Sequence, residues 1–247
     1  MTLYICGNSH ARALRAGASA LEQEEGADPM VVFPLGTADN EAQPFSAVER
    51  GKVVLTNKRF RKKLKQFFGF TAFDPGHRWG ICLGNHNFRI FRSDGWLTAA
   101  PSWMGLKNKT PISEALFERI VAEDQKHIRT FFDQLIETGV QPFVISAPWP
   151  LRPDPKISDL RLSPDVLKAL DTRARVLFSE WLAERNIMIV TPPVETADED
   201  GFLRPEFAKG GDDPYHGNNA YGRLMMRKVL QHEAKAVSIQ TPHKRLA

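Results

Sequence analysis

The chain has 247 residues, and 33 lysines and arginines against 29 aspartates and glutamates give it a formal net charge of +4. Hydrophobic residues make up 42% and charged residues 25%, which excludes collagen-like, coiled-coil and largely disordered proteins. The two cysteines, Cys6 and Cys82, exclude a disulfide framework and a zinc site made of cysteines alone. No stretch has the pattern of a signal peptide or the roughly 20 apolar residues of a membrane span, so we expect a cytoplasmic protein.

Short apolar runs rich in valine and isoleucine alternate with longer helical patterns along the chain. This alternation is typical of an α/β fold in which helices cover both faces of a parallel sheet. The sequence therefore predicts strands at residues 3–6, 30–33, 53–55, 79–83, 142–146 and 187–191. No linker divides the chain, so we expect one domain over residues 1–240 and a basic tail over residues 241–247.

The helical patterns carry recognisable start and stop signals. Thr110 before a proline predicts a helix that begins there and ends at Gly139. Ser163 before a proline predicts a second helix, which ends near Asn186. The last helix is predicted from about His216 to Glu233.

Two stretches depart from a simple strand–helix alternation. Residues 57–70 place phenylalanines and a leucine at helical spacing among lysines and arginines, which predicts an amphipathic helix with a solvated basic face. A surface for a membrane or an acidic ligand is the alternative for this stretch. Residues 88–104 are predicted to form an inserted hairpin that turns at Ser93-Asp94-Gly95, with Trp96 and Trp103 as substrate-binding residues in a wall of the site.

The first feature that concerns chemistry is Gly7-Asn8-Ser9-His10, directly after the first predicted strand. A helix that begins at about Ala11 places Ser9 in a sharp turn. There its own N–H and the positive end of the helix can face a developing oxyanion. The alternative is that Asn8 or Ser9 only caps the helix.

Two further features lie near other predicted element ends. Asp213 precedes His216 by three residues, so its carboxylate can orient the imidazole to accept a proton from a serine. The run Gly84-Asn85-His86-Asn87 follows the strand at residues 79–83, where a side-chain amide can donate to an oxyanion. Helix capping and turn formation are the alternatives for these residues. In a doubly wound sheet, however, all three sets can meet at the carboxyl ends of the strands.

These residues resemble the sequence blocks of the SGNH hydrolases, also called GDSL esterases and lipases. Gly7-Asn8-Ser9 resembles their Gly-Asp-Ser motif with asparagine in place of the aspartate, and Asp213-Pro214-Tyr215-His216 is similar to their Asp-x-x-His block. Gly84-Asn85-His86-Asn87 resembles their Gly-x-Asn-Asp block in part. Gly36, after the second strand, is the candidate for the glycine of the remaining block.

The resemblance implies a flavodoxin-like three-layer α/β/α sandwich with a mostly parallel central sheet, and no metal or cofactor. It also implies that Ser9 attacks an ester, that His216 accepts the serine proton and that Asp213 orients His216. The oxyanion donors would be the Ser9 N–H, the Gly36 N–H and the Asn85 side chain, while Asn87 is expected to stabilise the following turn. Asn8 removes a charge beside the nucleophile, and the irregular third block leaves the donor open between Asn85 and Asn87.

The sequence thus predicts a serine ester hydrolase that acts on an acyl ester of a carbohydrate or another small molecule. A ligand-binding domain that keeps the fold without turnover is the alternative. A binder of anions or nucleic acid through the basic residues 58–65 is a third, weaker interpretation, and no nucleic-acid partner is expected.

Overall fold

Five parallel strands form the central sheet of the computed structural model, which describes residues 2–36, 41–153, 162–211 and 213–240. Their order across the sheet is β10-β9-β6-β1-β2, and every neighbouring pair is parallel. The direction in which successive strands are added reverses between β1 and β6, which is the switch point of a flavodoxin-like sheet. The strands are β1 (Leu3–Gly7), β2 (Met30–Pro34), β6 (Arg78–Cys82), β9 (Pro142–Ile145) and β10 (Ile189–Val190).

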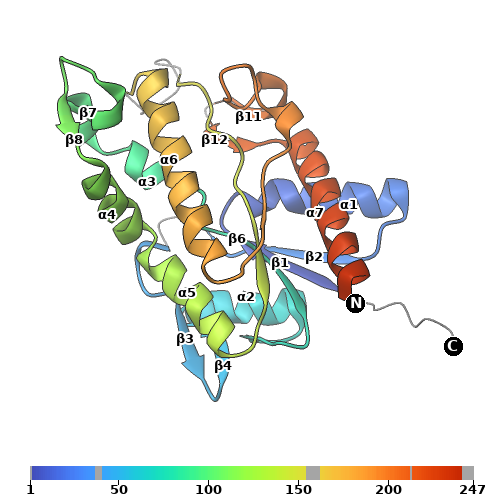
Figure 1. Ribbon diagram of the computed structural model, residues 1–247. Helices are drawn as coiled ribbons and strands as arrows, with labels where there is room; N and C mark the ends of the chain where they lie inside the picture. Colours follow the sequence, from blue (N-terminus) through green and yellow to red (C-terminus); the bar gives the residue numbers. More distant parts are fainter. Residues whose placement is uncertain (1, 37–40, 154–161, 212, 241–247) are drawn as a thin grey trace, which may run out of the picture.

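Helices cover both faces of this sheet, so the predicted three-layer fold is confirmed (Figure 1). On one face, α1 (Ala11–Glu25) and α7 (Asn219–Gln240) lie side by side over the side chains of Ile5 and Val32. The other face, which includes Cys6, packs against α2 (Lys58–Phe68), α5 (Lys126–Glu137) and α6 (Pro164–Ala183). Alternate residues of a strand point to opposite faces, which explains why neighbours such as Ile5 and Cys6 belong to different cores.

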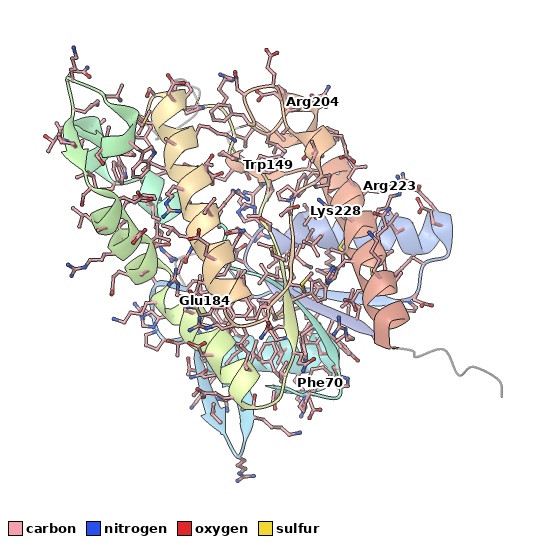
Figure 2. All side chains as sticks on the ribbon, viewed as in Figure 1. Phe70, Trp149, Glu184, Arg204, Arg223 and Lys228 are labelled. Atoms are coloured by element: carbon pink, nitrogen blue, oxygen red, sulfur yellow. The ribbon has the colours of Figure 1, made fainter. Side chains whose placement is uncertain are left out.

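The backbones of α1 and α7 approach each other closely at two glycines. A Cβ atom on Gly222 would overlap the carbonyl group of Ala13, and a Cβ atom on Gly17 would overlap the backbone of Gly222. Only glycine fits at these crossings because any side chain would push the helices apart. At the far end of α1, Glu24 and Glu25 form ion pairs with Arg223, the residue that follows Gly222 in α7 (Figure 2 labels Arg223).

Three small sheets flank the central one. Residues 53–55 do form a strand, but β4 (Lys52–Leu55) joins an antiparallel sheet with β3 (Ser46–Glu49) and β5 (Ala72–Phe73) rather than the central sheet. The pair β7 (Ala99–Pro101) and β8 (Thr110–Ile112) is parallel. The pair β11 (Ala208–Gly210) and β12 (Asp213–Gly217) is antiparallel and lies near the start of α7.

The predicted hairpin at residues 88–104 is wrong. The segment folds instead into the short helix α3 (Phe88–Phe91) and two 3₁₀ turns at Asp94–Leu97 and Ser102–Met104, and β7 pairs with β8 rather than back onto residues 88–93. The physical reason is burial, because Ile90, Phe91 and Trp96 share one core cluster with Phe117. A hairpin would alternate these apolar residues between two faces instead of gathering them on one.

Two predicted helix boundaries are also wrong. Residues 110–139 form β8 and then two helices, α4 (Glu114–Asp124) and α5, because Ser113 caps α4 and Gln125 interrupts it. Buried Gln125 donates from Nε2 to the carbonyl oxygen of Gly84 at 3.0 Å, a tie that holds the interruption in place. The last helix begins at Asn219, not His216, since the Asn218 side chain accepts a hydrogen bond from the N–H of Tyr221.

The basic stretch at residues 57–70 contains the predicted amphipathic helix. Asn57 caps α2 by accepting from the N–H of Arg59, and the helix buries Leu64 and Phe68 in the core. The predicted tail at residues 241–247 lies outside the described residues. Within the described part of the chain, no helix combines the length and apolarity needed to cross a membrane.

We expect Gly222→Ala to lower the free energy of unfolding by about 1–3 kcal/mol, because the added methyl group has no room against Ala13. It should also shift Ser9 and His216 relative to each other, since α1 begins two residues after Ser9 and α7 begins three residues after His216. Thermal or urea unfolding measures the first effect. Gly95→Ala is the matched control, because exposed Gly95 meets only the Ser93 hydroxyl at 3.3 Å. Equal stability of the two variants would contradict the tight crossing.

Candidate active site

Asn8 shapes the turn that presents Ser9. Its N–H donates to the carbonyl oxygen of Cys82 at 3.3 Å, and its Oδ1 accepts from the N–H of His10 at 3.1 Å. Helix α1 then begins at Ala11, as predicted. Since Asn8 supplies the local hydrogen bonds, the Ser9 hydroxyl is left to bond outside the turn.

Three side chains from the two ends of the chain form a continuous hydrogen-bonded series. Ser9 Oγ lies 2.7 Å from Nε2 of His216, and Nδ1 of His216 lies 2.7 and 2.9 Å from the two oxygens of Asp213. The carboxylate at Nδ1 favours the tautomer with the hydrogen on that nitrogen, so Nε2 can accept the hydrogen of the serine. The sequence placed His216 at the start of a helix, whereas it lies in β12, one residue before that strand ends.

The Asp213 carboxylate is held in place by other hydrogen bonds besides the one from the His216 ring. It accepts hydrogen bonds from the backbone N–H groups of Tyr215 and His216 at 3.2 and 3.1 Å and from Nζ of Lys209 at 2.7 Å. Partial burial by itself raises the pKa of this carboxyl, but the hydrogen bonds from Lys209 and His216 outweigh burial and lower the pKa to about 2. Asp213 is therefore ionised at neutral pH and can balance a positive charge that forms on His216.

Two side-chain networks hold the loop after β6, and they join each other at α6. Asn85 donates from Nδ2 to Oγ of Ser146 at 3.1 Å, and Arg175 donates to the same oxygen at 2.9 Å. Asn87 donates from Nδ2 to Asp171 at 3.0 Å, so the expectation that it stabilises a hairpin turn is wrong. Both networks reach into α6, since Asp171 and Arg175 pair there at 2.7 Å.

Gly84 allows this loop to pass close to α6. Its φ is +95°, a backbone conformation that other residues rarely adopt, and a Cβ atom there would overlap the ring of Phe178. The close passage brings Asn85 to the carboxyl end of β6, whose neighbour β1 ends just before Ser9. Ser9 and Asn85 thus follow the two strands that flank the switch point of the sheet.

A row of three imidazoles runs through the site. The ring centroids of His10 and His216 lie 4.6 Å apart, and those of His10 and His86 lie 4.4 Å apart. Burial lowers the pKa of His10 well below its usual range and lowers the pKa of His86 to about 3, and the nearby His216 and Arg175 act in the same direction. Both rings are therefore neutral at physiological pH.

The sequence reasoning singled out neither His10 nor His86, although both lie in the blocks it used. It also missed Asp171 and Arg175. The available signal was their spacing, because a charged pair four residues apart sits on the face of α6 that also carries buried Leu167 and Leu170. Charges on a buried face need partners, and here the partners are Asn85, Asn87 and Ser146.

Two cavities meet at His10 within the described part of the chain. The Ser9 groove is lined on one side by the start of α1 and on the other by β12 and the start of α7, with Ser9, Arg12, Lys209, His216 and Asn218 among its residues. The imidazole cavity is lined by His10, Asn85, His86, Asn87, Arg175 and neighbouring apolar side chains. Trp149, labelled in Figure 2 between α6 and α7, lines the imidazole cavity.

The predicted substrate-binding tryptophans are placed elsewhere, which corrects that prediction. Neither Trp96 nor Trp103 is among the described residues that line the two cavities. Trp96 is buried, and its indole N–H donates to the carbonyl oxygen of Ile90 at 2.8 Å. Trp103 is 43% exposed and packs edge-on against Phe117. Trp96 therefore belongs to the peripheral core around α4, and Trp103 lies at the surface beside α6, away from the site.

The positions of Gly36 and of the two cysteines say less about the chemistry of the site. Gly36 lies two residues beyond β2, which neighbours β1, so it lies at the same edge of the sheet as Ser9. Cys6 and Cys82 are buried on opposite faces of the sheet. Burial raises the pKa of both thiols, to about 12 for Cys82, so both cysteines stay protonated and pack as apolar residues.

No protein-family model matches the chain, and no curated protein matches it by sequence. Solved structures do match. One is the crystal structure of a carbohydrate acetylesterase family member from Sinorhizobium meliloti, with a TM-score of 0.50 and 10% sequence identity. The match covers 96% of this chain and 100% of that one. A GDSL-like lipase from Bacteroides thetaiotaomicron has a TM-score of 0.49 and 11% identity, over 95% of this chain and 88% of that one.

The likeness to the carbohydrate acetylesterase family member concerns the fold, because the sequences share so few residues. It agrees with the resemblance to the SGNH hydrolases that the sequence blocks carry, and that resemblance is confirmed at the level of the fold. A shared fold does not determine the activity, which depends on the side chains of the site.

We expect Trp96→Ala to lower the free energy of unfolding by about 3–5 kcal/mol, because it empties a large volume of the core and removes one hydrogen bond to the Ile90 carbonyl. Trp103→Ala, the matched control, should cost clearly less since the ring is half exposed. Urea unfolding of both variants measures this difference. A Trp96 variant with native stability would return this residue to consideration as a substrate contact.

Proposed function

We propose that the protein is a serine ester hydrolase of SGNH type that cleaves an acyl ester of a carbohydrate or another small molecule. The observation that supports this function most is the hydrogen-bonded series from Asp213 through His216 to Ser9. A helix cap would need none of these contacts, whereas nucleophilic catalysis by serine needs all of them.

In the first half of the reaction, Ser9 Oγ attacks the carbonyl carbon of the ester while Nε2 of His216 takes the hydroxyl proton. The electron pair of the C=O bond moves onto its oxygen, which becomes the oxyanion. We assign its donors to the N–H of Ser9, at the positive end of α1, to the N–H of Gly36 and to Nδ2 of Asn85. The bond from Asn85 to Ser146 uses one hydrogen of Nδ2 and leaves the other for this role.

In the second half, His216 returns the proton to the leaving alcohol and the acyl group remains on Ser9. Water then attacks the acyl-serine while His216 takes a proton from that water. The bond between the acyl carbon and Oγ breaks, His216 returns the proton to Ser9 Oγ, and the carboxylic acid is released. The imidazolium that forms in each half is balanced by the charge of Asp213, whose pKa of about 2 keeps it ionised.

The alternative of a binding domain without turnover rests on the irregular third block, Gly84-Asn85-His86-Asn87, and on Asn8, which takes the place of the aspartate in the Gly-Asp-Ser motif. In this chain Asn8 Oδ1 accepts from the N–H of His10, and a carboxylate oxygen could accept the same hydrogen bond. The substitution therefore keeps the turn that presents Ser9. This favours the hydrolase over the binding domain.

We expect a fluorophosphonate probe to label Ser9 covalently, because His216 can remove its proton. Ser9→Ala should abolish labelling, and Ser102→Ala, at an exposed serine, should leave it intact. Mass spectrometry of the labelled peptide identifies the residue. A folded protein that neither reacts with the probe nor hydrolyses short-chain esters would move the assignment to the binding domain.

We expect Asn85→Ala to lower kcat on a simple alkyl ester by about 100- to 1,000-fold with little change in KM, because an oxyanion donor acts mainly in the transition state. Exposed Asn108→Ala is the matched control and should be unaffected. Steady-state kinetics with circular dichroism as a folding check measures this. The same kinetic pattern in Asn87→Ala, with Asn85→Ala near normal, would move the donor to Asn87.

A further inference from the structure

The imidazole cavity contains polar atoms that nothing in the described chain satisfies. Both ring nitrogens of His10, Nδ1 of His86 and the side-chain oxygens of Asn85 and Asn87 are buried, and none has a hydrogen-bond partner among the described residues. His10, Asn85 and Asn87 are each at most 4% exposed. Buried polar groups are normally paired, so this concentration of unpaired atoms in one cavity indicates a missing partner.

The charges in the cavity are already balanced. Arg175 donates to Asp171, to Ser146 and to the carbonyl oxygens of Ala147 and Pro148, with distances between 2.6 and 3.1 Å. His10 and His86 are neutral because burial lowers the pKa of both. An anionic group would thus meet no unpaired cation among the described lining residues, and it would lie close to Asp171.

The donor or acceptor character of the unpaired atoms further limits which chemical group can occupy the cavity. Asn87 must donate to the Asp171 carboxylate, so its oxygen can only accept, and Asn85 is oriented in the same way by Ser146. His10 adds one donor and one acceptor, and the buried Nδ1 of His86 adds one or the other. The occupant must therefore both donate and accept hydrogen bonds. A hydroxyl group does both, whereas a carboxylate or a fully ionised phosphate cannot donate and an alkyl chain can do neither.

We propose that the imidazole cavity is a subsite for a hydroxyl-bearing group of the substrate, so that the protein acts on esters of polyols or sugars. This inference rests on the proposed hydrolase function. His10 lines both the cavity and the Ser9 groove, and Asn85 is the assigned oxyanion donor. A hydroxyl group in the cavity therefore lies beside the reacting ester, and the apolar walls from Phe88 and Trp149 suit the carbon skeleton that carries it.

The kinetic test compares glycerol monoacetate with propyl acetate, two esters of three-carbon alcohols that differ in their free hydroxyls. The native protein should prefer the glycerol ester in kcat/KM by about tenfold or more, because one or two extra hydrogen bonds form. His86→Phe keeps a ring of similar shape without its nitrogens and should remove most of that preference. His77→Phe, at an imidazole stacked on Phe70, is the matched control and should keep it.

Equal kcat/KM for the two esters in the native protein would overturn the proposal. An undiminished preference in folded His86→Phe would overturn it as well. Because the native protein is itself tested on both esters, a failure of His86→Phe to fold does not remove the test.

A binding measurement on Ser9→Ala separates this inference from the proposed function. Saturation-transfer NMR should detect glycerol but neither 1-propanol nor acetate on this variant, and His86→Phe should weaken the glycerol signal at least severalfold. Glycerol binding in a protein without esterase activity would support the subsite and refute the hydrolase. Acetate binding without glycerol would indicate an anion site, and binding of none of the three would leave water as the occupant. Either of these last two results overturns the proposal.

Discussion

The contact on which the site depends is the crossing of α1 and α7 at Gly17 and Gly222. Ser9 precedes α1 and His216 precedes α7, more than 200 residues apart in the chain, so their 2.7 Å contact requires the two helices to be held at one separation and one angle. Direct backbone contact provides this, because main-chain atoms cannot change rotamer to absorb a shift. The ion pairs of Arg223 with the far end of α1 add to the same alignment.

A second constraint fixes the opposite wall of the site. The loop after β6 is tied to α5 through Gln125, packed on α6 through Gly84, and hydrogen-bonded through Asn85 and Asn87 to the Arg175–Asp171 pair. The loop therefore behaves as part of the core although it has no regular secondary structure. Such a wall can hold an oxyanion donor without the movement that an exposed loop would allow.

The sequence predicted the parts of this protein in which local pattern and tertiary role agree. The apolar runs of β1, β2, β6 and β9 are buried on both faces of the sheet, and the Ser163-Pro164 start of α6 depends on local capping alone. The residues of the two end blocks were found because their spacing reflects a shared chemistry. Their contact with each other follows from the α1–α7 crossing, which no local pattern encodes.

The incorrect predictions come from interactions between distant segments. Gln125 interrupts a continuous helical pattern because it bonds to Gly84, forty-one residues away. Trp96 was predicted to lie in a wall of the site because it follows the Asn85 loop, yet it is buried in a core cluster with Phe117. His10 and His86 read as polar residues of two turns, since only the folded chain shows their rings in contact and the His10 ring buried.

The two sides of the site differ in charge, because charged side chains lie beside His216 on one side and neutral or mutually paired side chains lie on the other. On the side of the Ser9 groove, Lys209 and the ionised Asp213 lie beside His216, so an imidazolium formed in the proposed reaction would have a counterion within hydrogen-bond distance. On the other side, His10 and His86 are too deeply buried to ionise, and Asp171 and Arg175 neutralise each other. If His10 carried a proton, it would repel the developing charge on His216 at a ring separation of 4.6 Å. The neutrality of the imidazole cavity therefore supports the proposed role of His216 as a base, and the same neutrality makes the cavity suited to hydroxyl groups rather than ions.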